Sequence, residues 1–288
     1  MSLVVTGASG HLGRLVVEAL LERGTPATEI VATTRDPEAL TELTARGVEV
    51  RPADFNDPAS LRSAFAGARR ILLISTTDPE RLSGQRNAVE AAKDAGVELL
   101  AYTSLPHADT SSLLLAADHR ATEELIVSSG LTYAFLRNSW YHENYTEQLG
   151  PVLEHKAVLG SAGDGRVSAA ARADYAAAAA VVLAGNVAGN QVHELGGDTA
   201  YTLTEYAAAL SDATGETITY VDQPVAEYQA FLASVGVPAP MDAVLADADR
   251  GLSAGELLVE TGTLSRLIGR PTTPLADAIA AALPVIAA

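Results

Sequence analysis

Three evenly spaced glycines near the N-terminus are the residues of this chain best suited to bind a phosphate group. Gly7, Gly10 and Gly13 lie between a short apolar run and an amphipathic stretch. In a strand–turn–helix of this kind, the glycines permit the sharp turn, the approach of a pyrophosphate and close helix–strand packing. The positive end of the helix dipole then faces the phosphates. We therefore expect a dinucleotide to bind here, in contact with Gly7, Ser9, Gly10, His11, Leu12 and Gly13.

A cation follows the second apolar run, where the adenine ribose of a dinucleotide is expected. Arg35 comes directly after Thr34 and about 20 residues past the glycine turn, the usual position of the residue that contacts the 2′ position. A guanidinium pairs bidentately with a phosphate, whereas NAD-specific proteins use a carboxylate there. Arg35 therefore predicts NADPH as the cofactor; the alternative is a solvated surface arginine. Asp36 precedes a proline and is expected to cap a helix.

Polar residues also follow the third and fourth apolar runs. Asp54 and Phe55 are expected beside the adenine, with the carboxylate accepting from its exocyclic amine. The alternative for this pair is a turn acid and a core aromatic. Ser75, Thr76 and Thr77 follow the fourth run, and their hydroxyls are expected to border the ribose on the nicotinamide side.

The residues expected nearest the nicotinamide follow the fifth and sixth runs. Thr103 and Ser104 end the fifth, and Asn138 ends the sixth, followed closely by Trp140, the only tryptophan. An indole can stack on a planar ring, although Trp140 can instead be a core anchor. We expect Asn138, Trp140 and His119 to be the catalytic residues, with no metal site.

The proton donor common in short-chain dehydrogenases is absent from this sequence. Those enzymes carry Tyr-x-x-x-Lys on the helix after the fifth strand, and this chain contains no such motif. His119 is the most plausible titrating group on the corresponding stretch, unless it is a supporting or surface histidine. The absence favours an acceptor that takes hydride directly and can draw its proton from water, such as a quinone.

Alternating strands and helices must position these residues. Near-continuous apolar strands that alternate with amphipathic helices predict a parallel sheet with helices on both faces. The expected strands are Leu3–Thr6, Ile30–Thr34, Val48–Pro52, Arg70–Ser75, Leu99–Thr103 and Thr132–Leu136. The expected helices between them are Gly13–Arg23, Pro37–Arg46, Pro58–Phe65, Arg81–Ala95 and Ala116–Ser128.

The order is less regular after residue 138. A helix is expected over Tyr141–His155, followed by the helices and strands Ala173–Ala184, Gln191–Leu195, Leu203–Thr214, Ile218–Val221, Val225–Val235, Met241–Gly251 and Pro274–Leu283. We predict a Rossmann-type doubly wound α/β fold, with residues 1–138 as the NADP-binding domain. Residues 139–288 are expected to form a smaller α/β substrate-capping region that also returns segments to the sheet.

The composition narrows the choice of partners. The chain has 288 residues and a formal net charge of −17, which argues against nucleic acid and anionic membrane surfaces. It contains no cysteine, which excludes disulfides and thiol nucleophiles. Because the first expected strand begins at Leu3, we expect no signal peptide, and we expect no membrane insertion by the Ala-rich run Ala176–Ala184, which is short. We expect a cytoplasmic protein.

Several segments together resemble the NmrA-like group of atypical short-chain dehydrogenases, and within it the bacterial type 2 NADPH:quinone oxidoreductases. The segments are Thr6–Gly13, Ala101–Leu105, His107–Ser111, Leu136–Tyr145, Ala171–Ala179 and Leu267–Thr273, so the resemblance covers nearly the whole chain. It implies NADPH in a cleft and quinone reduction without flavin. It also places Gly7, Gly10, Gly13 and Arg35 on the cofactor and Ser75, Thr103 and Asn138 on its nicotinamide side.

Two other functions remain open from the sequence. Relatives within this group include redox sensors that bind the nucleotide with little turnover, and a reductase of another electron-poor small molecule is also compatible. A homo-oligomer is possible.

Overall fold

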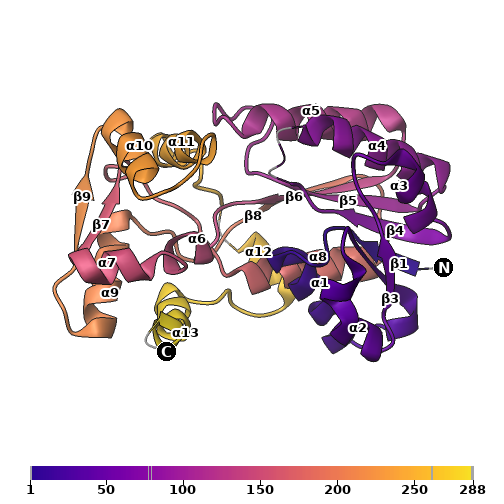
Figure 1. Cartoon of the computed structure of the whole chain (residues 1–288), viewed down its shortest axis with the longest axis horizontal. Helices are drawn as coiled ribbons and strands as arrows, with labels where there is room; N and C mark the ends of the chain where they lie inside the picture. The colour runs from indigo at the N-terminus through magenta and orange to yellow at the C-terminus, as the bar shows by residue number, and fades with distance from the viewer. Residues whose placement is uncertain (1, 77, 79, 261, 287–288) are drawn as a thin grey trace. The chain divides into compact units, whose positions relative to one another are not determined.

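The computed structural model describes residues 2–76, 78, 80–260 and 262–286, which form two compact units (Figure 1). Unit 1 runs to Ala108 and also contains Asp118–Asn138 and Arg172–His193. Unit 2 contains Asp109–Ala117, Ser139–Ala171 and the residues from Glu194 on. Both units are therefore assembled from separate stretches of chain.

Unit 1 is built on a seven-stranded sheet, as the alternating pattern predicts. The strand order is β3-β2-β1-β4-β5-β6-β8, and the pairs between β1, β2, β3, β4, β5 and β6 are parallel. The strands are β1 (Ser2–Val5), β2 (Ile30–Thr34), β3 (Glu49–Pro52), β4 (Ala68–Leu73), β5 (Leu99–Ser104), β6 (Tyr133–Asn138) and β8 (Gln191–Leu195). The order reverses between β1 and β4, which is where ligands bind in open sheets of this type.

Helices connect these strands and cover the sheet. They are α1 (His11–Glu22), η1 (Ala27–Glu29), η2 (Pro37–Leu40), α2 (Thr41–Ala45), α3 (Pro58–Ala64), α4 (Arg81–Asp94), α5 (Ala116–Ser129) and α8 (Arg172–Ala184). Buried residues of α3, α4 and α5 form one core with Val4, Ile71 and Leu100 of the strands. Helices α1 and α8 pack against each other. The doubly wound fold is thus confirmed.

Local sequence explains several helix starts. The carboxyls of Asp36 and Asp57 accept from the N–H groups of Glu38 and Ala59, at 3.1 and 2.9 Å, and each is followed by a proline. The cap expected at Asp36 is therefore present, and Asp57 forms a second cap of the same kind. Such caps satisfy N–H groups that have no acceptor within the helix.

Unit 2 contains a small second sheet and several helices. Strands β7 (Ala157–Gly160) and β9 (Thr219–Asp222) pair in parallel. The helices are α6 (Glu143–Thr146), α7 (Leu149–His155), α9 (Leu203–Thr214), α10 (Val225–Ser234), α11 (Met241–Ser253), α12 (Thr263–Ile268) and α13 (Leu275–Ile286).

The continuous helix expected over Tyr141–His155 was wrong. The structure has two short helices, α6 and α7, separated at Glu147 and Gln148. Pro151 in the first turn of α7 explains the break, because proline has no N–H to donate one turn back and is tolerated only near a helix start. Within the described ranges, the helices are all too short or too polar to cross a bilayer.

Candidate functional site

The glycine turn has the backbone geometry that a phosphate site requires. Gly7 has φ of +59°, a conformation that favours glycine, and Gly10 is the N-cap of α1. A Cβ on Gly13 would lie 2.4 Å from the carbonyl oxygen of Gly7, so only glycine allows α1 to pack this closely on the turn. Gly7 and Gly10 are both exposed, and the first N–H groups of a helix have no partner within it. The turn can therefore bind an anion with its backbone.

The end of β2 lies next to this turn. Thr34 donates to the hydroxyl of Ser9 at 2.9 Å, which ties the second strand to the glycine segment. Arg35 follows and is exposed, and it forms no hydrogen bond or ion pair with any other part of the described chain. Its guanidinium is therefore available to a phosphate. Asp36, by contrast, is engaged as a helix cap.

The pair after β3 is held by local contacts. The carboxyl of Asp54 accepts from the N–H of Asn56 at 2.9 Å, which makes a tight turn. Phe55 is half-buried against the core, and its carbonyl oxygen accepts from the side chain of Asn87 at 2.9 Å. A Cβ on Gly84 of α4 would lie 2.8 Å from Phe55. These contacts fit the turn-acid alternative for Asp54, and contact with the adenine stays a prediction for both residues.

Polar side chains converge where β4, β5 and β6 end. The hydroxyl of Thr103 accepts from the N–H of Ser75 at 2.9 Å and lies 3.2 Å from its hydroxyl oxygen. Ser104 and Asn138 are buried, and neither the hydroxyl oxygen of Ser104 nor the Oδ1 of Asn138 has a hydrogen-bond partner among the residues that the structure describes. Buried polar groups are normally paired, so these two atoms mark a place where a ligand can supply the missing partner. Thr76, the residue after Ser75, is half-buried.

Thr77 lies outside the described residues.

His119 is half-buried in unit 1. Its Nδ1 lies 2.9 Å from the hydroxyl of Tyr102, and Asp118 next to it pairs with Arg81. Burial, aided by the positive charge of Arg81, lowers the pKa of His119 to about 4. The imidazole is therefore neutral at pH 7 and has no proton to spare there. Burial raises the pKa of Tyr102.

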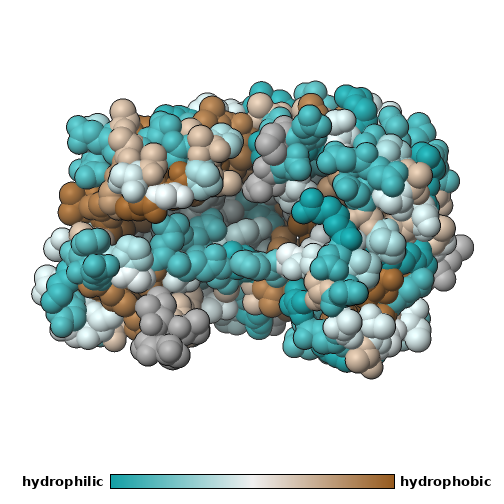
Figure 2. Space-filling view, viewed as in Figure 1, coloured by the Kyte–Doolittle hydropathy of each residue, from teal (hydrophilic) through white to brown (hydrophobic). Residues whose placement is uncertain are grey.

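Unit 2 contains an apolar cavity that the sequence did not predict. Its volume is about 120 Å³. Its aromatic lining is Trp140, Tyr145, Tyr206, Tyr228 and Phe231. On the face shown in Figure 2, hydrophobic residues gather on unit 2 between the positions of α10 and α7, two elements that also line the cavity. The chain runs from Asn138 to Trp140 with one residue between them, so the last residue of β6 is followed at once by a wall of this cavity.

A single carboxyl group lies among these apolar walls. Asp249, on α11, is 7% exposed, and its Oδ2 accepts from the N–H of Ser161 at 2.8 Å. A Cβ on Gly160 would lie 2.6 Å from that oxygen, so glycine at the end of β7 makes room for the carboxyl. Burial raises the pKa of Asp249 to about 7, against the opposing effect of the hydrogen bond from Ser161.

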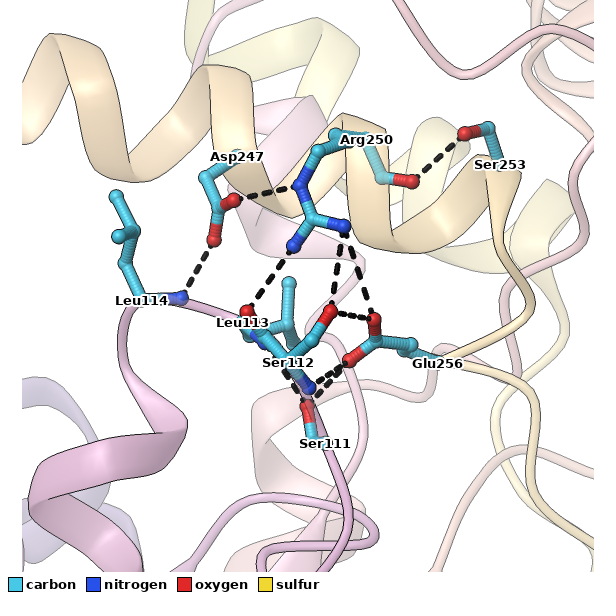
Figure 3. A network of polar contacts seen from close by, with 8 residues as sticks. All are labelled: Ser111, Ser112, Leu113, Leu114, Asp247, Arg250, Ser253 and Glu256. Atoms are coloured by element: carbon cyan, nitrogen blue, oxygen red, sulfur yellow. Dashed lines mark hydrogen bonds and ion pairs between the residues drawn. The ribbon is translucent and has the colours of Figure 1, made fainter.

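The helix that carries Asp249 also contributes to a polar network, through Asp247 and Arg250 (Figure 3). Asp247 accepts from the N–H of Leu114 at 2.6 Å and from Arg250 at 2.8 Å. Glu256 accepts from the N–H of Ser112 at 2.8 Å, and its hydrogen bonds lower its pKa although burial opposes this. The segment around Ser112 and the end of α11 are therefore held together within unit 2.

No group of three metal-ligating side chains occurs in the part of the chain that the structure describes. The site must therefore be considered as a nucleotide site in unit 1 and an apolar cavity in unit 2.

Comparisons with known proteins agree with the nucleotide site. Residues 7–184 match the model of a family described as NAD(P)H-binding. Quinone oxidoreductase 2 of Escherichia coli (strain K12) is 46% identical over 278 residues, which is 96% of this chain and 97% of that protein.

Solved structures are similar over nearly the whole chain. The crystal structure of NADPH-dependent quinone oxidoreductase QOR2 from E. coli, complexed with NADPH, has a TM-score of 0.94 and covers 98% of this chain and 99% of that one. The triphenylmethane reductase of Citrobacter sp., complexed with NADP(H), is 36% identical with a TM-score of 0.93, over 98% of this chain and 100% of that one.

Proposed function

This chain belongs to the NAD(P)H-binding family, and from that premise we propose that it is an NADPH-dependent quinone oxidoreductase. The observation that supports this most is the 46% identity to an E. coli quinone oxidoreductase across the full length of both chains, with a TM-score of 0.94. The apolar, aromatic cavity in unit 2 suits a flat, uncharged ring.

The residues of unit 1 fit NADPH. The exposed glycine turn offers backbone N–H groups and a helix N-terminus to the pyrophosphate. The exposed guanidinium of Arg35 suits the 2′-phosphate that distinguishes NADPH from NADH. The unpaired polar atoms of Ser104 and Asn138 suit the polar nicotinamide end. We propose that Gly7, Ser9, Gly10, His11, Leu12, Gly13, Arg35, Asp54, Phe55, Ser75, Thr76, Thr103 and Ser104 line the cofactor.

We propose further that the reaction needs no flavin. NADPH, when bound, supplies a hydride that a quinone can accept directly. The protein then has to hold the quinone and exclude water, and orientation of this kind accounts for a large part of many rate enhancements. Asn138 orients the reacting rings through its amide, and Trp140 offers an indole face inside the cavity. His119 is half-buried and neutral at pH 7, so we assign it a supporting position beside Tyr102.

The experiment is steady-state NADPH oxidation by purified, flavin-free protein with menadione or benzoquinone. Sustained turnover supports the proposal, together with stereospecific deuterium transfer from labelled NADPH. Binding of NADPH without turnover would favour a redox sensor instead. A bound flavin in active protein would contradict direct hydride transfer. We also propose that the protein works in the cytoplasm as a homo-oligomer.

A second acceptor class has its own support. The cavity has one carboxyl, and neither lysine nor arginine occurs among the described residues that line it. An electron-poor organic cation would suit that environment, and a 36% identical relative is a triphenylmethane reductase. A panel of quinones, nitroaromatics, enones and cationic dyes separates the two classes by their kcat/KM values.

A further inference from the structure

The cavity of unit 2 opens to solvent within that unit. Gln148, Pro151 and His155, on or beside α7, and Val235 at the end of α10 line it, and all four are exposed. Figure 2 shows hydrophobic residues at the surface between the positions of these two helices. Every described residue that lines the cavity belongs to unit 2. A small molecule can therefore enter from solvent, and this unit alone provides its contacts.

Aromatic rings form much of the wall of this cavity. The rings of Tyr145 and Tyr206 lie with their centroids 5.3 Å apart, and Trp140, Tyr228 and Phe231 line the same space. The face of an aromatic ring carries partial negative charge, so several rings around one space attract a cation, more strongly where water is excluded. Uncharged rings bind to such a wall too, so the aromatic residues alone do not distinguish the two kinds of ligand.

One carboxyl group adds the selectivity that the rings lack. Asp249 is 7% exposed, and its Oδ2 accepts from the N–H of Ser161 at 2.8 Å. Within the described ranges no group donates to its Oδ1. A buried carboxylate needs an opposite charge beside it, and a single N–H provides only part of that stabilisation. The cavity therefore contains one negative charge that the protein leaves to be balanced.

The surroundings of Asp249 provide no fixed positive charge. Neither lysine nor arginine occurs among the described residues that line the cavity. Arg250, the next residue of α11, donates to Asp247 and Ser112 instead (Figure 3). The titratable groups that face Asp249 or line the cavity with it are Tyr145 on α6, His155 on α7, Tyr206 on α9, Tyr220 and Asp222 on β9, and Tyr228 on α10.

A proton balances this charge when no other cation lies beside it. Burial raises the pKa of Asp249 to about 7, the negative charge of Asp222 adds to the rise, and the N–H of Ser161 opposes it. Near neutral pH the carboxyl therefore takes up a proton readily. The protonated form leaves an uncharged cavity, whereas the carboxylate form favours a positively charged ligand.

We propose that the cavity of unit 2 is a binding site for a compact organic cation, an amine or quaternary ammonium group that pairs with the carboxylate of Asp249 and contacts the aromatic rings. This inference does not rest on the proposed function, because binding needs neither NADPH nor a group that accepts hydride. It differs from the cationic acceptors considered above, since this ligand is bound and not reduced. The cation takes the place of the Asp249 proton, which leaves to the solvent.

The test is the binding of choline to the whole protein without NADPH, compared with the alcohol in which carbon replaces the choline nitrogen. The two molecules have nearly the same shape and differ in charge. At pH 8 we expect choline to bind at least about tenfold more tightly, because an ion pair is stronger in a site of low polarity than in water. Calorimetry and the emission of Trp140, the only tryptophan, measure both Kd values. Equal affinities, or no binding of choline, would overturn the proposal.

The pH dependence of binding identifies the carboxyl. Choline should bind about tenfold more tightly at pH 8 than at pH 6, because at pH 6 it must displace the proton of Asp249. Calorimetry at pH 6, in buffers of different ionisation enthalpy, should show release of about one proton on binding. Asp249→Asn keeps an oxygen for the N–H of Ser161 but carries no charge, so it should remove both effects and weaken choline binding at pH 8 at least about tenfold. Asp212→Asn, an exposed change on α9, is the matched control and should keep both.

His155 can produce the same trend, because it lines the cavity and its protonated form would repel a cation. In His155→Gln the pH effect should persist; if it vanishes there and persists in Asp249→Asn, the proposal is overturned. A cooperative urea transition of Trp140 emission shows that a variant is folded. Folded Asp249→Asn that binds choline as tightly as the unmodified protein would also contradict the proposal. Failure of the unmodified protein to oxidise NADPH with any quinone would refute the proposed function and leave this inference standing.

Discussion

Unit 1 and unit 2 leave different kinds of polar group unpaired. At the strand ends of unit 1, Ser75 and Thr103 bind each other, whereas the hydroxyl oxygen of Ser104 and the Oδ1 of Asn138 have no hydrogen-bond partner among the described residues. In the cavity of unit 2, the hydroxyls of Tyr145 and Tyr206 have none within the same described ranges. Unit 1 therefore offers a ligand a small hydroxyl and an amide oxygen, whereas unit 2 offers phenols set in an apolar wall.

Two titratable groups, one in each unit, show how loss of solvent acts on a base and on an acid. His119 is half-buried and Asp249 is buried, and desolvation shifts their pKa values in opposite directions. It lowers the pKa of His119 to about 4 and raises the pKa of Asp249 to about 7. At neutral pH the histidine has lost its proton, whereas the aspartate can still hold one.

Their effects on stability have opposite signs. The folded pKa of His119 lies below its unfolded value, so its contribution is present above about pH 6.5 and is lost as the pH falls toward 4. The folded pKa of Asp249 lies above its unfolded value, so its contribution is present at low pH and is lost as the pH rises toward 7.

Gly10→Val should have the largest effect, and it should impair the nucleotide site of unit 1 without affecting the cavity of unit 2. The backbone of Gly10 has φ of −79°, which valine can adopt, but the side chain would occupy the space that the pyrophosphate needs. We expect NADPH affinity, measured by calorimetry, to fall by at least about 100-fold, from the loss of several phosphate contacts. Quenching of Trp140 by menadione should stay unchanged. A folded variant that binds NADPH normally would show that the phosphates lie elsewhere.

Asn138→Ala should come second, because it removes a side chain at the end of β6 whose Oδ1 has no partner among the described residues. Turnover with menadione should fall more than about tenfold through misplacement of the rings, while NADPH binding changes less. Asn190→Ala is the matched control, since Asn190 accepts from the N–H of Tyr133 at the other end of the same strand. Equal turnover in both variants would remove Asn138 from the site.

Arg35→Ala tests how unit 1 selects its cofactor. One charge-assisted contact contributes about 1.5–3 kcal/mol, so the preference for NADPH over NADH should fall by about tenfold or more. The ratio of the two Kd values is the measurement. The exposed Arg62 of α3 provides the control change, Arg62→Ala. If the unmodified protein binds NADPH and NADH equally well, this assignment is wrong.

His119→Ala should have the smallest effect on turnover, less than about tenfold, because a neutral supporting group does not supply the proton. It should also change acid stability. Between pH 7 and pH 5, protonation of His119 should lower the free energy of unfolding of the unmodified protein by about 2 kcal/mol. The free energy of unfolding of the variant should not show this decrease. Urea unfolding at both pH values measures it. Complete loss of turnover with NADPH binding intact would make His119 the acid after all.

The nucleotide-binding fold was predictable because its signals are local. Glycine spacing, apolar runs and aspartate–proline caps each act within a few residues, and the expected strands of unit 1 lie within two residues of those observed. The break between α6 and α7 was missed although Pro151 signals it. Strand β7 was missed because four residues carry little pattern, and its partner β9 lies about sixty residues further along the chain.

The cavity was not predictable, because its walls come from helices and strands that meet only in the folded unit. Asp249 lies in the segment Ala-Asp-Ala-Asp-Arg-Gly251, which has the composition of a solvated helix face. A weak signal was present, since Asp242, Ala246 and Asp249 are spaced four and three residues apart, and all three are buried. Acids on the apolar face of a helix are the pattern to look for.

The interleaved assembly of the units has a consequence for protein synthesis. Unit 1 includes Arg172–His193, and the guanidinium of Arg70 donates to the carbonyl oxygens of Leu183 and Gly185. A nascent chain that has emerged only to Asn138 therefore lacks α8, β8 and the acceptors for Arg70. The ribosome must have translated past residue 193 before all the strands and helices of the nucleotide-binding unit exist, so no single cut in the chain separates the two units.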